Sequence, residues 1–190
     1  MYPIGKPVEE IETPSLLLDL SNFQWNIDKM FKFAKEAGVN VRPHAKTFKA
    51  AAICSKLLEA GAIGLMTQKL SEAEALLNAG VLYGDKNLLI SQELADSAKI
   101  ERLVGMNVAM GEGKVLTSIE NAEEAELLSK AALKWRTKQH VMRARLRWGQ
   151  KIEFVPSHCC TCINQHDNLF VIKDKKLAAV WPITARGKYY

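Results

Sequence analysis

Short apolar runs alternate with amphipathic segments along the first two thirds of the chain. Continuous apolar runs are typical of buried strands, and apolar residues repeated every three or four positions are typical of helices that cover them. The pattern predicts strands at residues 13–20, 39–42, 62–67, 87–91 and 114–118, and helices at residues 22–37, 49–60, 71–80, 96–104 and 122–134. Such alternation is typical of βαβ units, so we expect a parallel sheet with about four units between residues 39 and 134.

Polar residues mark the expected helix starts. Ser21 with Gln24, and Ser71 with Glu74, have the spacing of capping boxes, in which each side chain satisfies a free backbone N–H of the other residue. Gly38 follows the first helix, as a glycine just beyond a helix end commonly does.

The rhythm changes at Val141. From there short strands dominate, in the runs VMRARL, KIEFV, NLFVIK and LAAVWPI, with turns expected at Gly149-Gln150 and Asp174-Lys175. These runs predict an antiparallel module of roughly fifty residues, which is small for independent stability. We therefore expect it to pack on the α/β part or to take the first strand, residues 13–20, into its sheet.

Composition places the chain among globular proteins. It has 190 residues, 48% hydrophobic and 25% charged, with a formal charge of +5. No apolar run is long enough to span a membrane, and the first residues lack the apolar core of a secretory signal. Three of the four cysteines crowd into residues 159–162, which is poor spacing for a disulfide framework. We therefore expect a cytoplasmic protein.

The positive charge is concentrated in one stretch. Residues 127–152 contain no Asp or Glu but many Lys and Arg. Such a patch could bind nucleic acid or phosphate. The alternative interpretation is a solvated basic helix end followed by an edge strand, and it is favoured because no nucleic-acid motif surrounds the two tryptophans there.

The strongest local signal is the run RPHAKTFK at residues 42–49, at the expected carboxyl end of a parallel strand. Ligands bind at that edge in parallel α/β proteins. A lysine there, Lys46, can be partly desolvated and is a candidate for Schiff-base chemistry; the alternative is a surface lysine in a loop. Gln68 follows another strand at the same edge and is a weaker candidate for a ligand contact.

A second signal is His158-Cys159-Cys160, with His166 and Asp167 close behind. In an extended strand His158 and Cys160 share one face, and imidazole with thiolate is a good zinc donor set. Two protein ligands are too few for a structural site, so another group would complete it. The alternative is a core strand with buried cysteines and a hydrogen-bonded histidine.

The pairing of RPHAKT with a distant PSHCC in the C-terminal β module closely resembles the D-serine dehydratase/D-threonine aldolase-like family, which consists of fold-type III, alanine-racemase-like pyridoxal phosphate enzymes. The likeness covers residues 11–100, with runs such as GAIGLMTQKLSEAEALLNAG, and residues 149–188, with PSHCC, NQHD and VWPITARGK. Two distant motifs in the right order make it specific.

The resemblance implies a fold and domains. We expect an α/β protein with a partial (β/α) barrel of the alanine-racemase N-terminal type over residues 11–134. A small C-terminal antiparallel β domain with the metal motif would occupy residues 141–190. The family's barrel has eight βα units, whereas only about four are expected here. The residues that bind the cofactor phosphate in the family are not identified in this sequence.

The resemblance also implies a site and a reaction. Lys46 matches the lysine that binds pyridoxal 5'-phosphate covalently and removes the substrate α-proton, with Arg42, His44 and Gln68 as further cofactor contacts. His158 and Cys160 match two ligands of Zn2+, which would polarise the substrate hydroxyl. The implied reaction is conversion of D-serine to pyruvate and ammonia.

Three alternatives stay open at this point. The first is a D-threonine aldolase-type lyase, although Cys160 favours the dehydratase branch. The second is a catalytically silent family remnant that acts, if at all, as a metal-binding or interaction protein. The third is a basic nucleic-acid-binding module. The expected partners are a small D-amino acid and a second copy in a homodimer, with no nucleic acid and no membrane.

Overall fold

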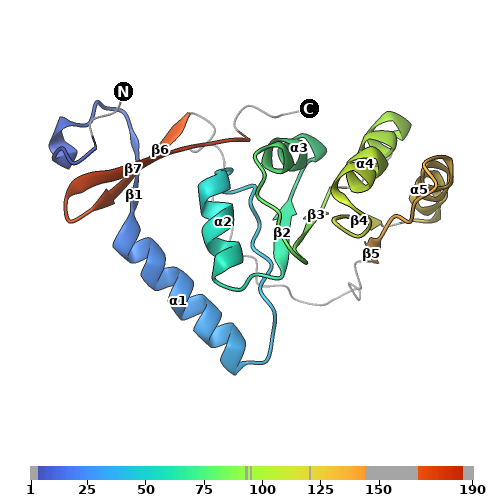
Figure 1. Ribbon diagram of the computed structural model, residues 1–190, viewed down its shortest axis with the longest axis horizontal. Coiled ribbons are helices and arrows are strands. Elements are labelled where there is room, and N and C mark those ends of the chain that lie inside the picture. Colours follow the sequence, from blue (N-terminus) through green and yellow to red (C-terminus); the bar gives the residue numbers. More distant parts are fainter. Residues whose placement is uncertain (1–3, 93, 95, 120, 144–166, 186–190) are drawn as a thin grey trace.

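The computed structural model describes residues 4–92, 94, 96–119, 121–143 and 167–185, and Figure 1 shows two sheets joined by helices. The elements are η1 (Val8–Glu10), β1 (Leu16–Asp19), α1 (Leu20–Glu36), α2 (Ala51–Glu59), β2 (Gly64–Thr67), α3 (Leu70–Asn78), β3 (Asn87–Ile90), α4 (Ser97–Met110), β4 (Val115–Ile119), α5 (Ala122–Lys134), β5 (Val141–Arg143), β6 (Asn168–Lys173) and β7 (Lys176–Pro182). Within the described residues no helix has both the length and the apolar character needed to cross a membrane.

The larger sheet has the order β2-β3-β4-β5, and every pairing in it is parallel. Leucine, isoleucine and valine from β3, β4 and helices α3, α4 and α5 form its main core. The predicted βαβ alternation is therefore confirmed. Its strands form an open sheet, and the described part of the chain contains no closed barrel.

Strand β5 corrects one expectation from the sequence. Val141 was expected to open the antiparallel module, but Val141–Arg143 pairs in parallel with β4 and continues the larger sheet. The reason is topological, because a strand that follows helix α5 after a short connection returns in the same direction as β4. The three residues of β5 do not indicate which strand they pair with.

The strand expected at residues 39–42 is replaced by an irregular edge segment. Residues 41–45 run along β2 with only an isolated parallel bridge, between His44 and Met66. Three backbone hydrogen bonds hold the segment there: Ile63 N to Val41 O at 3.0 Å, Met66 N to Pro43 O at 2.9 Å, and Ala45 N to Met66 O at 2.6 Å. Pro43 has no N–H to donate, so the regular ladder is interrupted at this residue.

The smaller sheet has the order β1-β6-β7, with β1 and β6 parallel and β6 and β7 antiparallel. The expectation that the C-terminal strands take the first strand into their sheet is therefore confirmed. The β6–β7 hairpin turns at Asp174 and Lys175, whose φ values are 52° and 58°. Two positive φ angles in a two-residue loop match the twist of paired strands, so the predicted turn is also confirmed.

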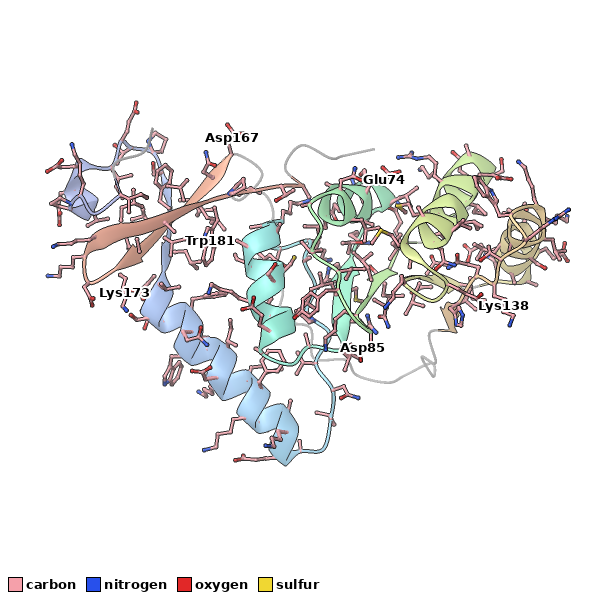
Figure 2. The ribbon with its side chains drawn as sticks, in the orientation of Figure 1. Glu74, Asp85, Lys138, Asp167, Lys173 and Trp181 are labelled. Carbon is pink, nitrogen blue, oxygen red and sulfur yellow. The ribbon has the colours of Figure 1, made fainter. Side chains whose placement is uncertain are left out.

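A small apolar cluster packs the α2 region against the smaller sheet. Ala50 and Ile53 from the α2 region pack with Leu169 and Ile183 from the smaller sheet and its continuation. Trp181, labelled in Figure 2, lies edge-on to a phenylalanine of α1 and below the Lys56 ammonium, which is 5.7 Å from the ring centroid. The segment around Lys46 lies beside β2 through the His44–Met66 bridge, and the residues just after it pack against the β1-β6-β7 sheet.

The residues predicted for both capping boxes are wrong, because each helix begins one residue before the expected serine. Helix α1 starts earlier, and the Asp19 carboxylate accepts from Asn22 N at 2.8 Å. Helix α3 has Lys69 at its N-cap position, with Glu72 as the acidic partner three residues on. In each case the helix begins before the expected serine, because a carboxylate is available to satisfy the first free N–H groups.

Helix α4 continues to Met110, beyond the expected end at residue 104. Asn107 is buried within it and donates to Lys138 O at 3.0 Å, while its side-chain oxygen accepts from Val115 N at 3.3 Å. These bonds tie the last turns of α4 to the connection between α5 and β5 and to the start of β4. Tertiary contacts thus extend the helix through a glycine-containing stretch that is weakly helical by propensity.

Candidate functional site

The carboxyl ends of the parallel strands bring three sequence-predicted residues to one edge. The bridge between His44 and Met66 is parallel, so Lys46 and Gln68, two residues further on, come level with each other. Gln68 in turn lies level with Ser91, because β2 and β3 pair in parallel up to the preceding residue of each strand. The edge therefore gathers an imidazole, an amine, an amide and a hydroxyl.

The amine of Lys46 is held by Gln68. Lys46 Nζ donates to Gln68 Oε1 at 3.1 Å, and both side chains are partly buried. Lys46 lies in the turn that follows the edge segment, and Gln68 in the turn that follows β2. The side-chain amide therefore fixes the direction of the amine at the ligand-binding edge of the sheet.

His44 belongs to a short hydrogen-bonded chain. Its Nδ1 accepts from Lys46 N at 3.4 Å, so in the neutral ring the proton is on Nε2. Nε2 lies 3.5 Å from Ser91 Oγ, which itself donates to Thr67 O at 2.9 Å. This network selects one tautomer and orients the imidazole beside the Lys46 turn.

Burial keeps the imidazole uncharged. Desolvation, and then the positive charge of Lys46, lower the pKa of His44 from 6.5 to about 4. At neutral pH the ring is therefore a neutral donor and acceptor, and it adds no second positive charge beside Lys46.

The stability of the fold should depend on pH through His44. In the unfolded chain the His44 ring takes up a proton below pH 6.5, whereas in the folded protein it does so only near pH 4. The contribution of the neutral ring to the free energy of unfolding is therefore fully present above pH 6.5 and is lost as the pH falls toward 4. The shift alone corresponds to about 3 kcal/mol, which partial exposure of the ring reduces to about 1–2 kcal/mol. Urea unfolding at pH 7 and pH 4.5 measures this loss, and His44→Gln should reduce it. An equal loss in His44→Gln would assign the acid sensitivity to other groups.

Arg42 lies away from this cluster. Its Nη1 donates to Asn87 Oδ1 at 2.6 Å and to Leu65 O at 3.2 Å, at the amino ends of β2 and β3. Lys46 lies at the opposite, carboxyl end of β2, level with Gln68. Burial lowers the pKa of the Arg42 guanidinium below its usual value. Arg42 thus binds groups at the amino ends of the strands, away from the carboxyl edge. Its expected contact with a cofactor stays a prediction.

Gly64 makes room for the Asn87 backbone carbonyl and for this guanidinium. A Cβ at Gly64 would clash most closely with the Asn87 backbone oxygen, and it would lie 2.5 Å from Arg42 Nη1 and 2.7 Å from Asn87 Oδ1, closer than real contacts allow. Gly64→Ala should therefore reduce the free energy of unfolding by about 1–3 kcal/mol. Gly105→Ala is the matched control, because its Cβ would meet only the Trp135 ring at 3.7 Å and alanine favours a helix by about 1 kcal/mol. Chemical denaturation of both variants measures the difference; equal effects would contradict this role for Gly64.

A buried ion pair joins the two segments that carry Lys46 and Gln68. Lys49 Nζ contacts Glu72 Oε1, and the two side chains are only 6% and 5% exposed. The other carboxylate oxygen accepts from Gln68 N at 3.0 Å and from Lys69 N at 3.3 Å. One carboxylate therefore binds the segment that carries Lys46 and the segment that carries Gln68.

Sequence reasoning missed Ser91, Glu72 and Lys49 as members of this site. Ser91 follows β3 as Gln68 follows β2, so the strand-end rule that found Gln68 also applies to it. The sequence pattern predicts Ser71 as the N-cap, which makes Glu74 the acidic partner; the helix begins at Leu70, so Glu72 has that position instead. Lys49 carries no signal of its own within RPHAKTFK.

The predicted metal ligands His158 and Cys160 lie outside the described residues. Among the residues that the structure does describe, no group of three or more His, Cys, Asp and Glu side chains could hold a metal ion. Burial raises the pKa of the Cys54 thiol to about 12, so this cysteine is a core residue without reactive character. The zinc site stays a prediction.

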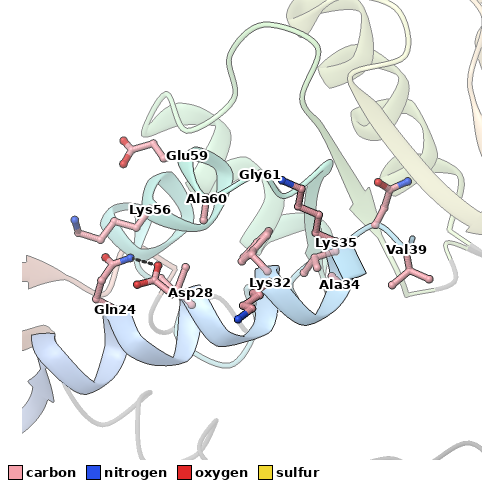
Figure 3. Close-up of a pocket in the computed structure, with 14 residues that line it drawn as sticks. Gln24, Asp28, Lys32, Ala34, Lys35, Val39, Lys56, Glu59, Ala60 and Gly61 are labelled. Carbon is pink, nitrogen blue, oxygen red and sulfur yellow. Dashed lines mark hydrogen bonds between the residues drawn. The ribbon is translucent and has the colours of Figure 1, made fainter. Parts of the chain in front are cut away.

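A separate cleft of about 800 Å3 lies between α1 and α2, as Figure 3 shows. Lys32 and Asp28 line it, and Gln24 Nε2 donates to Asp28 Oδ1 at 2.9 Å across one turn of α1. The Lys32 side chain is 78% exposed. Solvated lysines of this kind lack the environment that activates an amine, so the cleft is a weaker candidate for chemistry than the Lys46 edge.

The described part of the basic stretch supports the structural interpretation of its charge. Lys134 pairs with Glu101 at 3.0 Å, and Lys130 lies 4.0 Å from Glu126. Trp135 Nε1 also donates to Glu101, at 2.8 Å. Acidic residues elsewhere in the sequence thus balance part of a stretch that looked uniformly basic.

Comparisons with known proteins identify the family of this chain. The family described as putative serine dehydratase domain matches residues 67–172. The chain is 41% identical over 101 residues to a 3-hydroxy-D-aspartate aldolase of Paracoccus denitrificans, an alignment that covers 52% of this chain and 25% of that protein. The chain thus spans about a quarter of that curated relative.

Solved structures show the same fold. A D-threonine aldolase from Filomicrobium marinum matches with a TM-score of 0.70 and 29% identity, over 86% of this chain and 42% of that chain. An alanine-racemase-like protein from Idiomarina loihiensis matches with a TM-score of 0.62 and 21% identity, over 89% of this chain and 45% of that one, which supports the fold alone. The predicted α/β fold of alanine-racemase type is therefore confirmed. Since the family match spans more than half of the 190 residues, the chain belongs to the putative serine dehydratase domain family.

Proposed function

We propose that this chain provides the lysine-bearing part of a pyridoxal phosphate-dependent lyase that acts on D-β-hydroxy amino acids, with Lys46 as the residue that binds the cofactor. The observation that carries the proposal is the pairing of Lys46 Nζ with Gln68 Oε1, 3.1 Å apart, at the carboxyl edge of the parallel strands. That edge is where α/β folds of this kind place their ligands.

The donor set fits the amine end of the proposed cofactor. Pyridoxal phosphate requires a primary amine that is partly shielded from water, and Lys46 is a partly buried primary amine. When bound, the cofactor supplies an electron sink for the substrate α-carbon. Lys46 Nζ is the group that would take the α-proton, and Gln68 keeps the amine directed toward the strand edge.

His44 contributes a neutral ring. Because its pKa is lowered to about 4, the imidazole is uncharged at neutral pH. It would therefore not form an ion pair with a bound phosphate or carboxylate, and other groups would have to neutralise that charge. Its Nε2 is directed to Ser91, so it orients the hydroxyl at the end of β3. Both groups lie at the edge that the substrate would approach.

The substrate class comes from the family and its members. The family is described as a putative serine dehydratase domain, and the similar proteins are named as aldolases of 3-hydroxy-D-aspartate and D-threonine. These compounds share a D-configured α-amino acid with a β-hydroxyl. We propose D-serine as the first substrate to assay and D-threonine as the second, with pyruvate and ammonia as the products expected from D-serine.

Zinc is part of the same proposal. His158 and Cys160 fall within the residues that match the family, and imidazole with thiolate suits Zn2+. A metal held there would polarise the substrate hydroxyl. A homodimer and a cytoplasmic location are further proposals that follow from the family and the cysteine pattern.

The deciding experiment is borohydride trapping. The purified protein is incubated with pyridoxal phosphate, reduced, digested and examined by mass spectrometry. A phosphopyridoxyl group concentrated on Lys46 supports the proposal and justifies assays with D-serine, D-threonine and added zinc. No stable adduct, or adducts spread over many lysines, would favour a family member without catalysis.

A further inference from the structure

Glu72 occupies a position that simple helix capping does not explain. A cap needs one side-chain oxygen, and Glu72 Oε2 fills that role by accepting from Gln68 N and Lys69 N. Its second oxygen, Oε1, contacts Lys49 Nζ from a segment 23 residues earlier in the chain. The carboxylate therefore links the two turns beyond the backbone hydrogen bond from Ala45 N to Met66 O.

The burial of this pair points to a role other than stability. The Lys49 and Glu72 side chains are 6% and 5% exposed, and taking two charges out of water costs about as much as their attraction returns. Apolar side chains of similar volume would serve stability as well or better. A buried ion pair is better suited to fixing one arrangement of the segments that carry it.

Lys49 is also held in a backbone conformation that is unfavourable for its side chain. Its φ is +52°, in the left-handed region that favours glycine. Its carbonyl accepts from Ala185 N at 3.1 Å, and Ala51 N donates to Thr184 Oγ1 at 3.2 Å. The chain after β7 thus holds this turn from the other side, and local strain of this kind is concentrated at functional sites.

We propose that Glu72 is a positioning residue, whose carboxylate holds the Lys46 turn through Lys49 and the Gln68 turn through its backbone N–H, and thereby sets the distance between Lys46 Nζ and Gln68 Oε1. The inference rests on the proposed function of Lys46. Lys49 lies three residues after Lys46, and Gln68 binds Glu72 by its backbone and Lys46 by its side chain. A change in the position of the Glu72 carboxylate would therefore move both Lys46 and Gln68.

The test compares Glu72→Gln with Leu128→Ala. Leu128 is a buried core residue of α5, remote from the site, so its truncation destabilises the fold without touching either turn. Two quantities are measured in each full-length protein: the share of trapped phosphopyridoxyl that lies on Lys46, and hydrogen exchange of the amides in residues 45–49 and 67–69. The first reports on the amine, and the second reports on the turns without any cofactor.

We expect the share of trapped phosphopyridoxyl on Lys46 to fall about tenfold in Glu72→Gln. In Leu128→Ala the same share should stay within about twofold of wild type. Exchange in both turns should rise in Glu72→Gln more than in the control. Equal trapping in wild type and Glu72→Gln would overturn the inference while leaving the proposed function intact. If wild-type protein shows no selective adduct, the proposed function fails, and the exchange comparison alone decides whether Glu72 holds the turns.

Discussion

Lys46→Arg should abolish the phosphopyridoxyl adduct at this position. Arginine keeps the positive charge and can still donate to Gln68 Oε1, but its guanidinium stays protonated and cannot act as a nucleophile. The proposed lyase activity should fall on the order of a thousandfold. Peptide mapping after borohydride reduction, together with a coupled assay of product formation, measures both effects.

The control for this variant is Lys32→Arg. Lys32 is a highly exposed lysine of α1 in the α1–α2 cleft, so its replacement should leave the adduct at Lys46 unchanged. If Lys46→Arg still carries one dominant adduct on another lysine, the cofactor lysine has been misassigned. If activity survives while the adduct disappears, the charge at this position matters and covalent binding through it does not.

Much of the fold could be predicted because its elements follow local rules. Apolar runs flanked by amphipathic segments gave the strands and helices of the parallel sheet, and helix α5 matches its expected range of residues 122–134. The boundaries shifted where tertiary partners intervene, as at the Asn107 side chain in α4. The partner of β5 could not be read from its residues, because parallel pairing depends on the path of the chain after α5.

The site was predictable in the same uneven way. Lys46 and Gln68 each follow an expected strand, so the strand-end rule located both, and the register then places them level with each other. The partners of Arg42 and Glu72 could not be predicted, because they depend on which residues face one another across the sheet. The sequence pattern indicates on which element and at which end of it a residue lies, whereas tertiary packing determines which residues its side chain contacts.

Glu72→Leu should be among the most destabilising single changes in the described structure. It leaves the Lys49 ammonium buried without its partner and removes the acceptor for two backbone N–H groups. We expect a loss of about 3–5 kcal/mol in the free energy of unfolding, against a total of about 5–15 kcal/mol for a typical domain. Urea denaturation at pH 7 measures it.

The matched control is an exposed ion pair. Lys32 and Glu36 lie 3.9 Å apart with side chains 78% and 66% exposed, so Glu36→Leu should change stability by less than about 1 kcal/mol. A loss of similar size in both variants would show that burial of the Lys49–Glu72 pair has no special consequence. Lys49→Met should cost less than Glu72→Leu, because the carboxylate keeps its two backbone donors.

The double variant Lys49→Met/Glu72→Leu separates the charge from the hydrogen bonds. Removing both charges eliminates the unpaired ammonium, so the double variant should be more stable than Glu72→Leu alone. The backbone N–H groups of Gln68 and Lys69 still lack their acceptor, which leaves a loss of about 1–3 kcal/mol. Full recovery would mean that water satisfies these N–H groups. No recovery would mean that the carboxylate stabilises the fold through the α3 cap and that its bond to Lys49 contributes little.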